Sequence, residues 1–306
     1  MRRMAVATAC VGVLAAALAA WGVAAPAGPS AQGALHAAAK KKSKLPPLPA
    51  AVKRAKKWRI GVKCDTPPFG YVDLKGRNAG YDVEIAHWFS RFAFGNPNKV
   101  DFTCVTTASR IPTLTSGKID LIIATMTFTH ARAQTVDFST PYYVATGRML
   151  VPNSSSLRLS SIAGKTITTT GGSIYDRWLT KCFSSVHELL FQSPTLALAA
   201  LKDGRADAEM FDDSFLLGVA TTDPSLKLTP DRFLKLPWGI GIAKGDTAMA
   251  KWVNSRLAIL KKRNLFLKIL KHNVAPTLFG AFKNNVPGPH RTLHYPPTEE
   301  AELGCP

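Results

Sequence analysis

Side chains that could bind a carboxylate are concentrated in the stretch from Ser109 to Tyr143. A short apolar run within it, 119–124, predicts a strand buried on both faces of a parallel sheet. Threonine hydroxyls follow that run, and Arg132 comes one turn into the next predicted helix. In an open α/β sheet, ligands bind where strands end and the following helices begin. A planar guanidinium at such a position can hold a carboxylate through two parallel hydrogen bonds.

Local sequence signals predict the elements that position these groups. Pro112 is tolerated in the first turn of a helix, and Gly117 is expected to end that helix. Thr129 is placed to cap the next helix, and Thr125 and Thr127 lie between the strand and that helix. A strand end, a row of hydroxyls, a helix amino terminus and a guanidinium should therefore meet in one small volume.

Composition describes a globular chain with an uneven charge. With 306 residues, 46% of them hydrophobic, and a mean hydropathy of +0.02, the chain can hold one or two domains with ample core. The formal charge is +19, but 11 of the 39 basic residues lie in residues 1–59, before the first acidic residue, Asp65. The remaining 28 basic and 20 acidic residues give the rest of the chain +8. This distribution disfavours nucleic-acid binding, whereas a moderately basic body favours an anionic ligand.

The amino terminus has the pattern of an export signal. Arg2 and Arg3 precede an apolar run, 4–25, which ends near a small-x-small cleavage site, so residues 1–27 are interpreted as a secretory signal peptide. The run is also long enough to remain as an uncleaved membrane anchor. Residues 28–57 form a basic linker rich in Pro, Ala and Lys, which we expect to be disordered or extended. The mature protein is therefore expected in the periplasm or another extracytoplasmic space.

From Trp58 onward, predicted strands alternate with predicted helices, which indicates an α/β fold with parallel sheets. Strands are expected at 59–64, 100–105, 166–169 and 206–210. Helices are expected from Asp82 onward, at 195–201, and over the amphipathic region 248–271.

Several motifs resemble the family 3 extracellular solute-binding proteins, the amino-acid receptors of ABC importers. They are the Ser109–Tyr143 stretch and the segments GVKCDTPPFGY, GYDVEIA and GIGIAKGD, and the similarity extends from about 58 to 274. The resemblance implies a two-lobed periplasmic-binding-protein fold of type II, in which each lobe is a mostly parallel sheet with flanking helices. It places lobe 1 at 58–146 and 237–275 and lobe 2 at 147–236, joined by a hinge. The C-terminal tail, 276–306, falls outside the resemblance.

Five cysteines are present, and Cys10 lies in the expected leader. The other four allow three full pairings, and an exported protein permits disulfides without requiring them. The family fold places the strands that end at Cys64 and Cys104 side by side. The resemblance therefore implies a Cys64–Cys104 disulfide, with Cys182–Cys305 as the remainder, and four buried or free thiols as the alternative.

The resemblance also implies how the two backbone charges of an amino acid would be held. Arg132 matches the family's carboxylate-binding arginine. Backbone N–H groups near Ser173 and Ile174, at a helix start in the opposite lobe, would assist it.

Asp212 matches the family's ammonium-binding position, and its neighbour Asp213 is the rival. The Thr127 hydroxyl and the Thr125 carbonyl would accept the remaining ammonium protons. A buried charge needs pairing, so an ammonium facing one carboxylate is physically reasonable.

Lys63 and Arg110 match the positions that face the distal carboxylate in glutamate- and aspartate-binding members, with Thr107 nearby. Two cations would suit glutamate or aspartate and would disfavour lysine, arginine or histidine as ligands. Strand alternation could instead turn Lys63 outward, and glutamine stays an alternative because an arginine can donate to an amide oxygen. Phe69 and Tyr71 could line the pocket, although core packing is favoured for both.

The predicted function is extracytoplasmic capture of glutamate or aspartate by hinge closure, for delivery to the membrane permease of an ABC importer. The chain is expected to be a monomer without a nucleic-acid partner. A cofactor or a metal is not expected, since phosphate-loop, nucleophile-elbow and metal-ligand motifs are missing from the sequence. The alternatives are a glutamine receptor, an amino-acid sensor domain, and an enzyme similar to cyclohexadienyl dehydratases. In such an enzyme Glu209 or Asp213 would be the acid.

Overall fold

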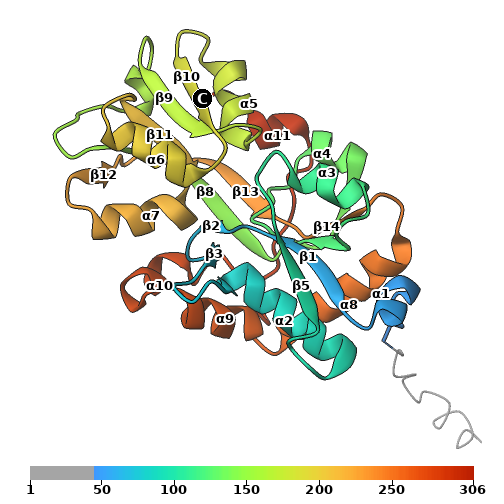
Figure 1. The fold of residues 1–306 in the computed structure, drawn as a ribbon. Helices are drawn as coiled ribbons and strands as arrows, with labels where there is room; N and C mark the ends of the chain where they lie inside the picture. Colours follow the sequence, from blue (N-terminus) through green and yellow to red (C-terminus); the bar gives the residue numbers. More distant parts are fainter. Residues whose placement is uncertain (1–44) are drawn as a thin grey trace, which may run out of the picture. The chain divides into compact units, whose positions relative to one another are not determined.

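Two β-sheets with helices packed on them organise residues 45–306, the part of the chain that this computed structural model describes (Figure 1). We call the residues around the first sheet lobe 1 and those around the second sheet lobe 2. The expected signal peptide, 1–27, and the first part of the expected linker, 28–44, lie outside the described residues. Within the described part, no helix is both long and apolar enough to span a membrane.

Lobe 1 is built on a sheet with the strand order β5-β1-β6-β14-β7. Its strands are β1 (Trp58–Val62), β5 (Val100–Cys104), β6 (Leu121–Ile122), β7 (Val136–Phe138) and β14 (Gly241–Ala243). A small antiparallel sheet in the same lobe contains β2 (Asp65–Thr66), β3 (Gly70–Val72) and β4 (Asn78–Ala79). The helices of this lobe are α1 (Ala50–Ala55), α2 (Tyr81–Phe94), α3 (Arg110–Thr115), α4 (His130–Thr135), α8 (Thr247–Lys262), α9 (Leu265–Asn273) and α10 (Pro276–Phe282).

Lobe 2 is built on a sheet with the order β10-β9-β11-β8-β12, and β13 also pairs with β8. Its strands are β8 (Tyr143–Pro152), β9 (Thr166–Thr170), β10 (His187–Phe191), β11 (Ala208–Asp212), β12 (Leu226–Leu228) and β13 (Phe233–Trp238). The helices are α5 (Ile174–Cys182), α6 (Pro194–Lys202), α7 (Asp213–Thr222) and the short 3-10 helix η1 (Leu159–Ser161), and α11 (Glu299–Leu303) follows near the end of the chain.

Strands β8 and β13 carry the chain from lobe 1 to lobe 2 and back. They pair antiparallel, with Tyr143 opposite Trp238 and Ala145 opposite Leu236. Strand β1 runs parallel to β5 and β6, and β9 runs parallel to β10 and β11, as the alternation of strands and helices predicts. Both sheets are nevertheless mixed, because β8 and β14 enter them from the crossing segments without a crossover helix and pair antiparallel.

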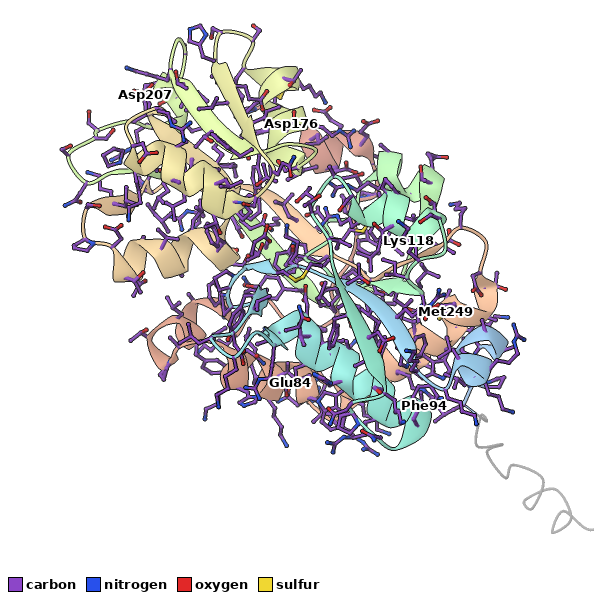
Figure 2. The ribbon with its side chains drawn as sticks, in the orientation of Figure 1. Glu84, Phe94, Lys118, Asp176, Asp207 and Met249 are labelled. Atoms are coloured by element: carbon purple, nitrogen blue, oxygen red, sulfur yellow. A yellow bond between two sulfur atoms is a disulfide. The ribbon has the colours of Figure 1, made fainter. Side chains whose placement is uncertain are left out.

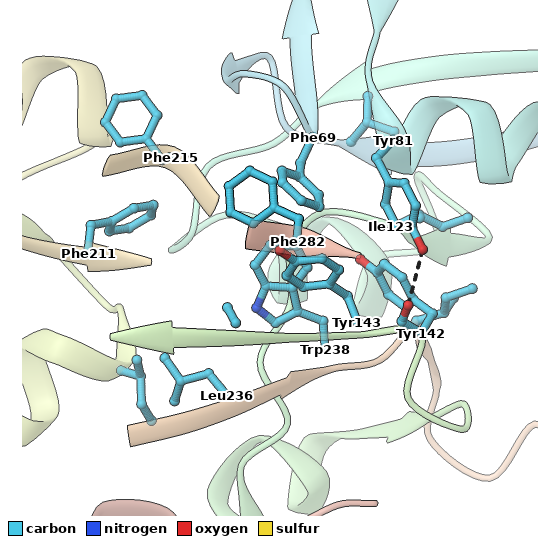
Figure 3. Packing of buried hydrophobic residues seen from close by; sticks show 14 of the residues in the cluster. Phe69, Tyr81, Ile123, Tyr142, Tyr143, Phe211, Phe215, Leu236, Trp238 and Phe282 are labelled. Carbon is cyan, nitrogen blue, oxygen red and sulfur yellow. Dashed lines mark hydrogen bonds between the residues drawn. The ribbon is translucent and has the colours of Figure 1, made fainter. Parts of the chain in front are cut away.

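An aromatic cluster packs where the crossing strands leave lobe 1 (Figure 3). Phe69 is its centre and is fully buried, with ring centroids 4.7 Å from Tyr143 and 5.1 Å from Trp238. The edge-to-face contacts of Phe69 with these two rings stabilise the core beyond the area that they bury. The Tyr81 hydroxyl adds a hydrogen bond to the Tyr142 carbonyl at 3.2 Å. Phe69 therefore has the core role favoured from the sequence.

Two segments without an expected fold are ordered elements. Within the expected linker, 50–55 forms α1, and Val52 packs into the core of lobe 1. The expectation of a disordered or extended linker is wrong for these residues, because Val52 is buried and Leu48, just before the helix, also packs against the core. The C-terminal tail forms α10, an irregular segment with turns, and α11, and Leu303 is buried.

Both implied disulfides are present, Cys64–Cys104 and Cys182–Cys305 (Figure 2). The first joins the ends of β1 and β5, which are neighbours in the lobe 1 sheet, so the implied pairing is confirmed. The second joins α5 to the last residues of the chain, across 123 positions.

Candidate functional site

A small cavity of about 20 Å³ lies between the two lobes, at the ends of β6 and β11 and at the amino terminus of α5. Its lining residues are mostly polar: Thr107, Arg110, Thr125, Thr127, Arg132, Ser173, Ile174, Tyr175, Phe211 and Asp212. Eight of the nine residues predicted from the sequence are in this set, and Lys63 is the exception. The structure thus brings together groups from four separate segments of the chain.

One peptide unit after β6 is held from both ends by buried charged side chains. The Asp82 carboxylate accepts from the Thr125 N–H at 2.7 Å, and Arg110 Nη1 donates to the Ala124 carbonyl at 2.7 Å. Thr125 has a φ of +45°, which is unfavourable for a β-branched residue and persists only when its surroundings enforce it. These two hydrogen bonds supply that enforcement and place the Thr125 side chain at the cavity.

Arg110 is buried and retains unused donors. Burial lowers the pKa of its guanidinium to about 10, and nearby Tyr142, Asp212 and Asp82 favour the charged form. Its Nη1 also lies 3.3 Å from the Thr125 carbonyl, whereas its Nε has no partner among the described residues. A buried donor without a partner is costly, so this position favours a ligand that offers an acceptor.

Arg132 connects the lobes. The Thr129 hydroxyl accepts from the Arg132 N–H at 3.0 Å, which confirms the expected cap of α4. The Arg132 guanidinium donates to the Thr127 carbonyl at 2.8 Å and, across the cleft, to the Gly172 carbonyl of lobe 2 at 3.0 Å. Burial and the charge of Arg110 lower its pKa to about 9. Two of its five N–H groups are used in these bonds, and three are left for a ligand.

The amino terminus of α5 supplies the opposing wall. The Ser173 hydroxyl caps this helix by accepting from the Asp176 N–H at 3.2 Å. The backbone N–H of Ser173 donates to the Thr170 carbonyl at 3.0 Å. The Ser173 N–H is therefore occupied within the protein. Ile174, the first residue of the helix, lines the cavity and follows this cap.

Asp212 and its neighbour have different surroundings. Asp212 lines the cavity at the end of β11, and the Tyr175 hydroxyl donates to its Oδ1 at 2.6 Å. Burial raises the pKa of Asp212 to about 7. Asp213 instead accepts from the Thr146 N–H at 3.1 Å and lies outside the cavity lining. Of the two carboxylates, only Asp212 is available at the cavity.

Lys63 faces inward, but it does not line the cavity. Its side chain is 1% exposed, so the alternative in which strand alternation turns it outward is wrong. Its Nζ lies 3.0 Å from Asp65 Oδ1 as an ion pair, but it is among the buried atoms without hydrogen-bond geometry to a partner. Burial lowers the pKa of the ammonium, and Asp65 offsets part of that lowering. A carboxylate two residues away thus already pairs with this cation.

Two lining residues, Tyr175 and Phe211, were not predicted from the sequence. Each is adjacent to a residue that was: Tyr175 follows Ile174 at the helix start, and Phe211 precedes Asp212 on β11. That adjacency was the available signal. Tyr71, in β3, is half-buried and is absent from the lining.

A second contact joins the lobes on the side of α6. The hydroxyl of Thr195, in the first turn of that helix, donates to the Asp65 carbonyl of lobe 1 at 3.0 Å. Together with the Arg132–Gly172 bond, it shows the lobes in contact around the cavity. Among the described residues, no group of His, Cys, Asp and Glu is arranged to hold a metal ion.

Comparison with known proteins agrees with this architecture. The profile of the "Bacterial extracellular solute-binding proteins, family 3" matches residues 58–274. The chain belongs to this family. It is 35% identical over 236 residues to the ABC transporter glutamine-binding protein GlnH of Bacillus subtilis, covering 76% of this chain and 86% of that one. It is 36% identical over 198 residues to the glutamine-binding protein of Geobacillus stearothermophilus, covering 63% of this chain and 75% of that one.

Solved structures give the same assignment. The solute receptor for L-cysteine of Neisseria gonorrhoeae matches with a TM-score of 0.70 and 34% identity, covering 75% of this chain and 94% of that one. The two-lobed fold of type II is therefore confirmed, as is membership among the amino-acid-binding receptors of ABC transporters.

Proposed function

We propose that this solute-binding protein captures an α-amino acid with an uncharged polar side chain, glutamine ahead of glutamate or aspartate, for an extracytoplasmic ABC importer. Arg132 would hold the carboxylate, and Asp212 and Thr127 the ammonium. Arg110 and Thr107 would face the side chain. The permease of the importer would be the macromolecular partner.

The balance of charge around the cavity carries this proposal. The cations in or beside the site are Lys63, Arg110 and Arg132, and the carboxyl groups are Asp65, Asp82 and Asp212. Burial raises the pKa of Asp82 and of Asp212 to about 7, so the three positive charges are balanced when both of these groups are ionised. A zwitterionic amino acid with a neutral side chain keeps this balance, whereas glutamate adds an uncompensated negative charge. The acidic-ligand prediction counted Lys63 as a free cation, but Asp65 already pairs with it.

Arg110 suits an amide side chain. Its buried Nε requires an acceptor, and an amide oxygen can supply one without adding charge. The two glutamine-binding relatives support the same choice, while the L-cysteine receptor makes a smaller polar side chain the main competitor.

An enzymatic function finds no support at the two candidate acids. Glu209 is fully buried with neither carboxylate oxygen hydrogen-bonded, and it is absent from the cavity lining. Asp213 accepts a backbone hydrogen bond outside that lining. A general acid must reach the proton-accepting atom of the substrate, and these positions do not offer that. The named relatives are likewise binding proteins.

Calorimetric titration with glutamine, glutamate, aspartate, cysteine and arginine tests the proposal. We expect glutamine to bind at least tenfold more tightly than glutamate, and Arg110→Ala to weaken it by about 2 kcal/mol, or roughly 30-fold. Arg91→Ala, on the exposed side of α2 in lobe 1, serves as the control. Tighter binding of glutamate or aspartate would refute the charge-balance argument. Failure of all five ligands would refute the amino-acid assignment.

A further inference from the structure

The last residues of the chain contact both lobes, and they lie outside the family match, which ends at 274. We call the segment from Tyr295 to Cys305 the C-terminal strap. In Figure 1 its helix, α11, lies beside α5 of lobe 2 and α4 of lobe 1. The strap is therefore a third connection between the lobes, in addition to β8 and β13.

The end of the strap is fixed to lobe 2. Cys305 forms the disulfide with Cys182 at the end of α5. The Trp178 indole N–H donates to the Gly304 carbonyl at 3.0 Å, and Lys181 Nζ donates to the Leu303 carbonyl at 3.2 Å. Because one of these links is covalent, residues 303–305 must move with lobe 2.

The beginning of the strap is packed on lobe 1. The Tyr295 ring stacks on Phe128 with centroids 4.2 Å apart, and its hydroxyl donates to the Ser139 carbonyl at 2.5 Å. The Tyr295 hydroxyl occupies the space that a side chain at position 239 would need, and only because this residue is Gly239 is there no collision. This close fit indicates a specific packing site for Tyr295.

Between these two ends, Glu302 bonds directly to the ligand-binding segment of lobe 1. Its Oε2 accepts from the His130 N–H at 2.9 Å and lies 2.9 Å from His130 Nδ1. Glu302 is 3% exposed, and His130 is the first residue of α4, the helix that carries Arg132. A hydrogen bond from a backbone amide to a buried carboxylate is of the strong, charge-assisted type.

We propose that the C-terminal strap stabilises the closed state of the receptor, and that Glu302 is the contact that breaks on opening. The ten residues after Tyr295 span up to about 33 Å when extended, so the disulfide limits opening without preventing it. The Glu302–His130 contact exists only when lobe 2 carries residues 303–305 close to α4. It thereby favours closure and holds the segment that positions Arg132, which should slow ligand release. This last effect rests on the proposed function.

The test compares Glu302→Ala with a matched control, Glu300→Ala. Glu300 is on the same helix, but its ion pair is with Lys181 of lobe 2 and does not cross between the lobes. Hydrogen exchange of the His130 amide, measured by NMR without ligand, should be at least tenfold faster in Glu302→Ala than in the control. The double variant Cys182→Ser/Cys305→Ser should accelerate the same amide. Equal exchange in Glu302→Ala and Glu300→Ala would overturn the proposal.

A second measurement separates this proposal from the proposed function. We expect stopped-flow dissociation of glutamine to be severalfold faster in Glu302→Ala than in Glu300→Ala, and equal rates would overturn the role of the strap in closure. If the wild-type protein binds no glutamine, the proposed ligand is wrong. Small-angle scattering of the ligand-free variants then tests the role of the strap in closure. A larger radius of gyration in Glu302→Ala than in Glu300→Ala supports that role, and equal radii refute it.

Discussion

Asp82 and Arg110 hydrogen-bond to opposite ends of the same peptide unit. The carboxylate accepts from the Thr125 N–H and the guanidinium donates to the Ala124 carbonyl, each at 2.7 Å. Asp82 comes from the start of α2 and Arg110 from the start of α3, so two helices jointly fix the backbone that follows β6. The hydroxyls predicted to contact a ligand depend on that backbone.

We expect Asp82→Ala to lower the free energy of unfolding by about 2 kcal/mol, because it leaves a buried N–H unpaired and releases the strained Thr125 backbone. Arg110→Ala should have an effect of similar size. Since both act on one peptide unit, the double variant should differ from additivity by about 1 kcal/mol. Urea unfolding of the four proteins measures this coupling, and additive effects would show that the two bonds act independently.

Ligand affinity should rise with pH as Asp212 ionises. Burial raises the pKa of its carboxyl to about 7, whereas an ammonium ligand favours the charged form and so lowers that pKa in the complex. Below pH 7, binding must therefore expel a proton, and affinity should increase about tenfold per pH unit between pH 5 and 6. Above pH 7 this increase should level off.

Calorimetry in buffers of different ionisation enthalpy measures that proton directly. At pH 6 the apparent enthalpy should vary with the buffer in the wild-type protein, with close to one proton released. Asp212→Asn should bind more weakly and show no such dependence, whereas Asp213→Asn should retain it. Identical enthalpies in all buffers for the wild-type protein would contradict the assignment of Asp212 to the ammonium.

The sequence predicted the parts of the site that depend on local order along the chain. Thr125, Thr127 and Arg132 lie within one strand-loop-helix unit, where the cap at Thr129 determines the geometry. The Tyr175–Asp212 hydrogen bond, in contrast, joins residues 37 positions apart and depends on how α5 packs beside β11. Spacing in the sequence contains no signal for such a contact.

Lys63 shows a different limit of sequence reasoning. Alternation along the strand leaves the direction of this side chain open, and the Asp65 carboxylate that pairs with it belongs to the next short strand, β2. The C-terminal tail could not be interpreted, since its contacts are with distant segments and no motif in it resembles the family. In both cases the missing information is which side chains meet after folding.

Selectivity should respond to the Lys63–Asp65 pair. In Asp65→Asn the buried ammonium loses its counter-charge, so a ligand carboxylate nearby becomes more favourable. We expect the ratio of glutamate to glutamine affinity to increase about tenfold, which corresponds to roughly 1.4 kcal/mol. Asp101→Asn, which breaks the exposed Lys57–Asp101 pair in the same lobe, should leave the ratio unchanged. An unchanged ratio in Asp65→Asn as well would mean that Lys63 does not influence the ligand side chain.

Closure should also depend on the Thr195–Asp65 contact. Valine has nearly the shape of threonine, so Thr195→Val removes the 3.0 Å hydrogen bond to the Asp65 carbonyl while α6 keeps its packing. A neutral hydrogen bond contributes about 0.5–1.5 kcal/mol, so ligand affinity should fall roughly two- to tenfold. Thr221→Val removes a hydroxyl bond to the carbonyl of Leu217, within α7, and is the matched control. Because the Thr195 bond is available only when the lobes meet, the loss should appear as faster dissociation with an unchanged association rate. Equal dissociation rates in the two variants would show that this contact does not contribute to the closed state.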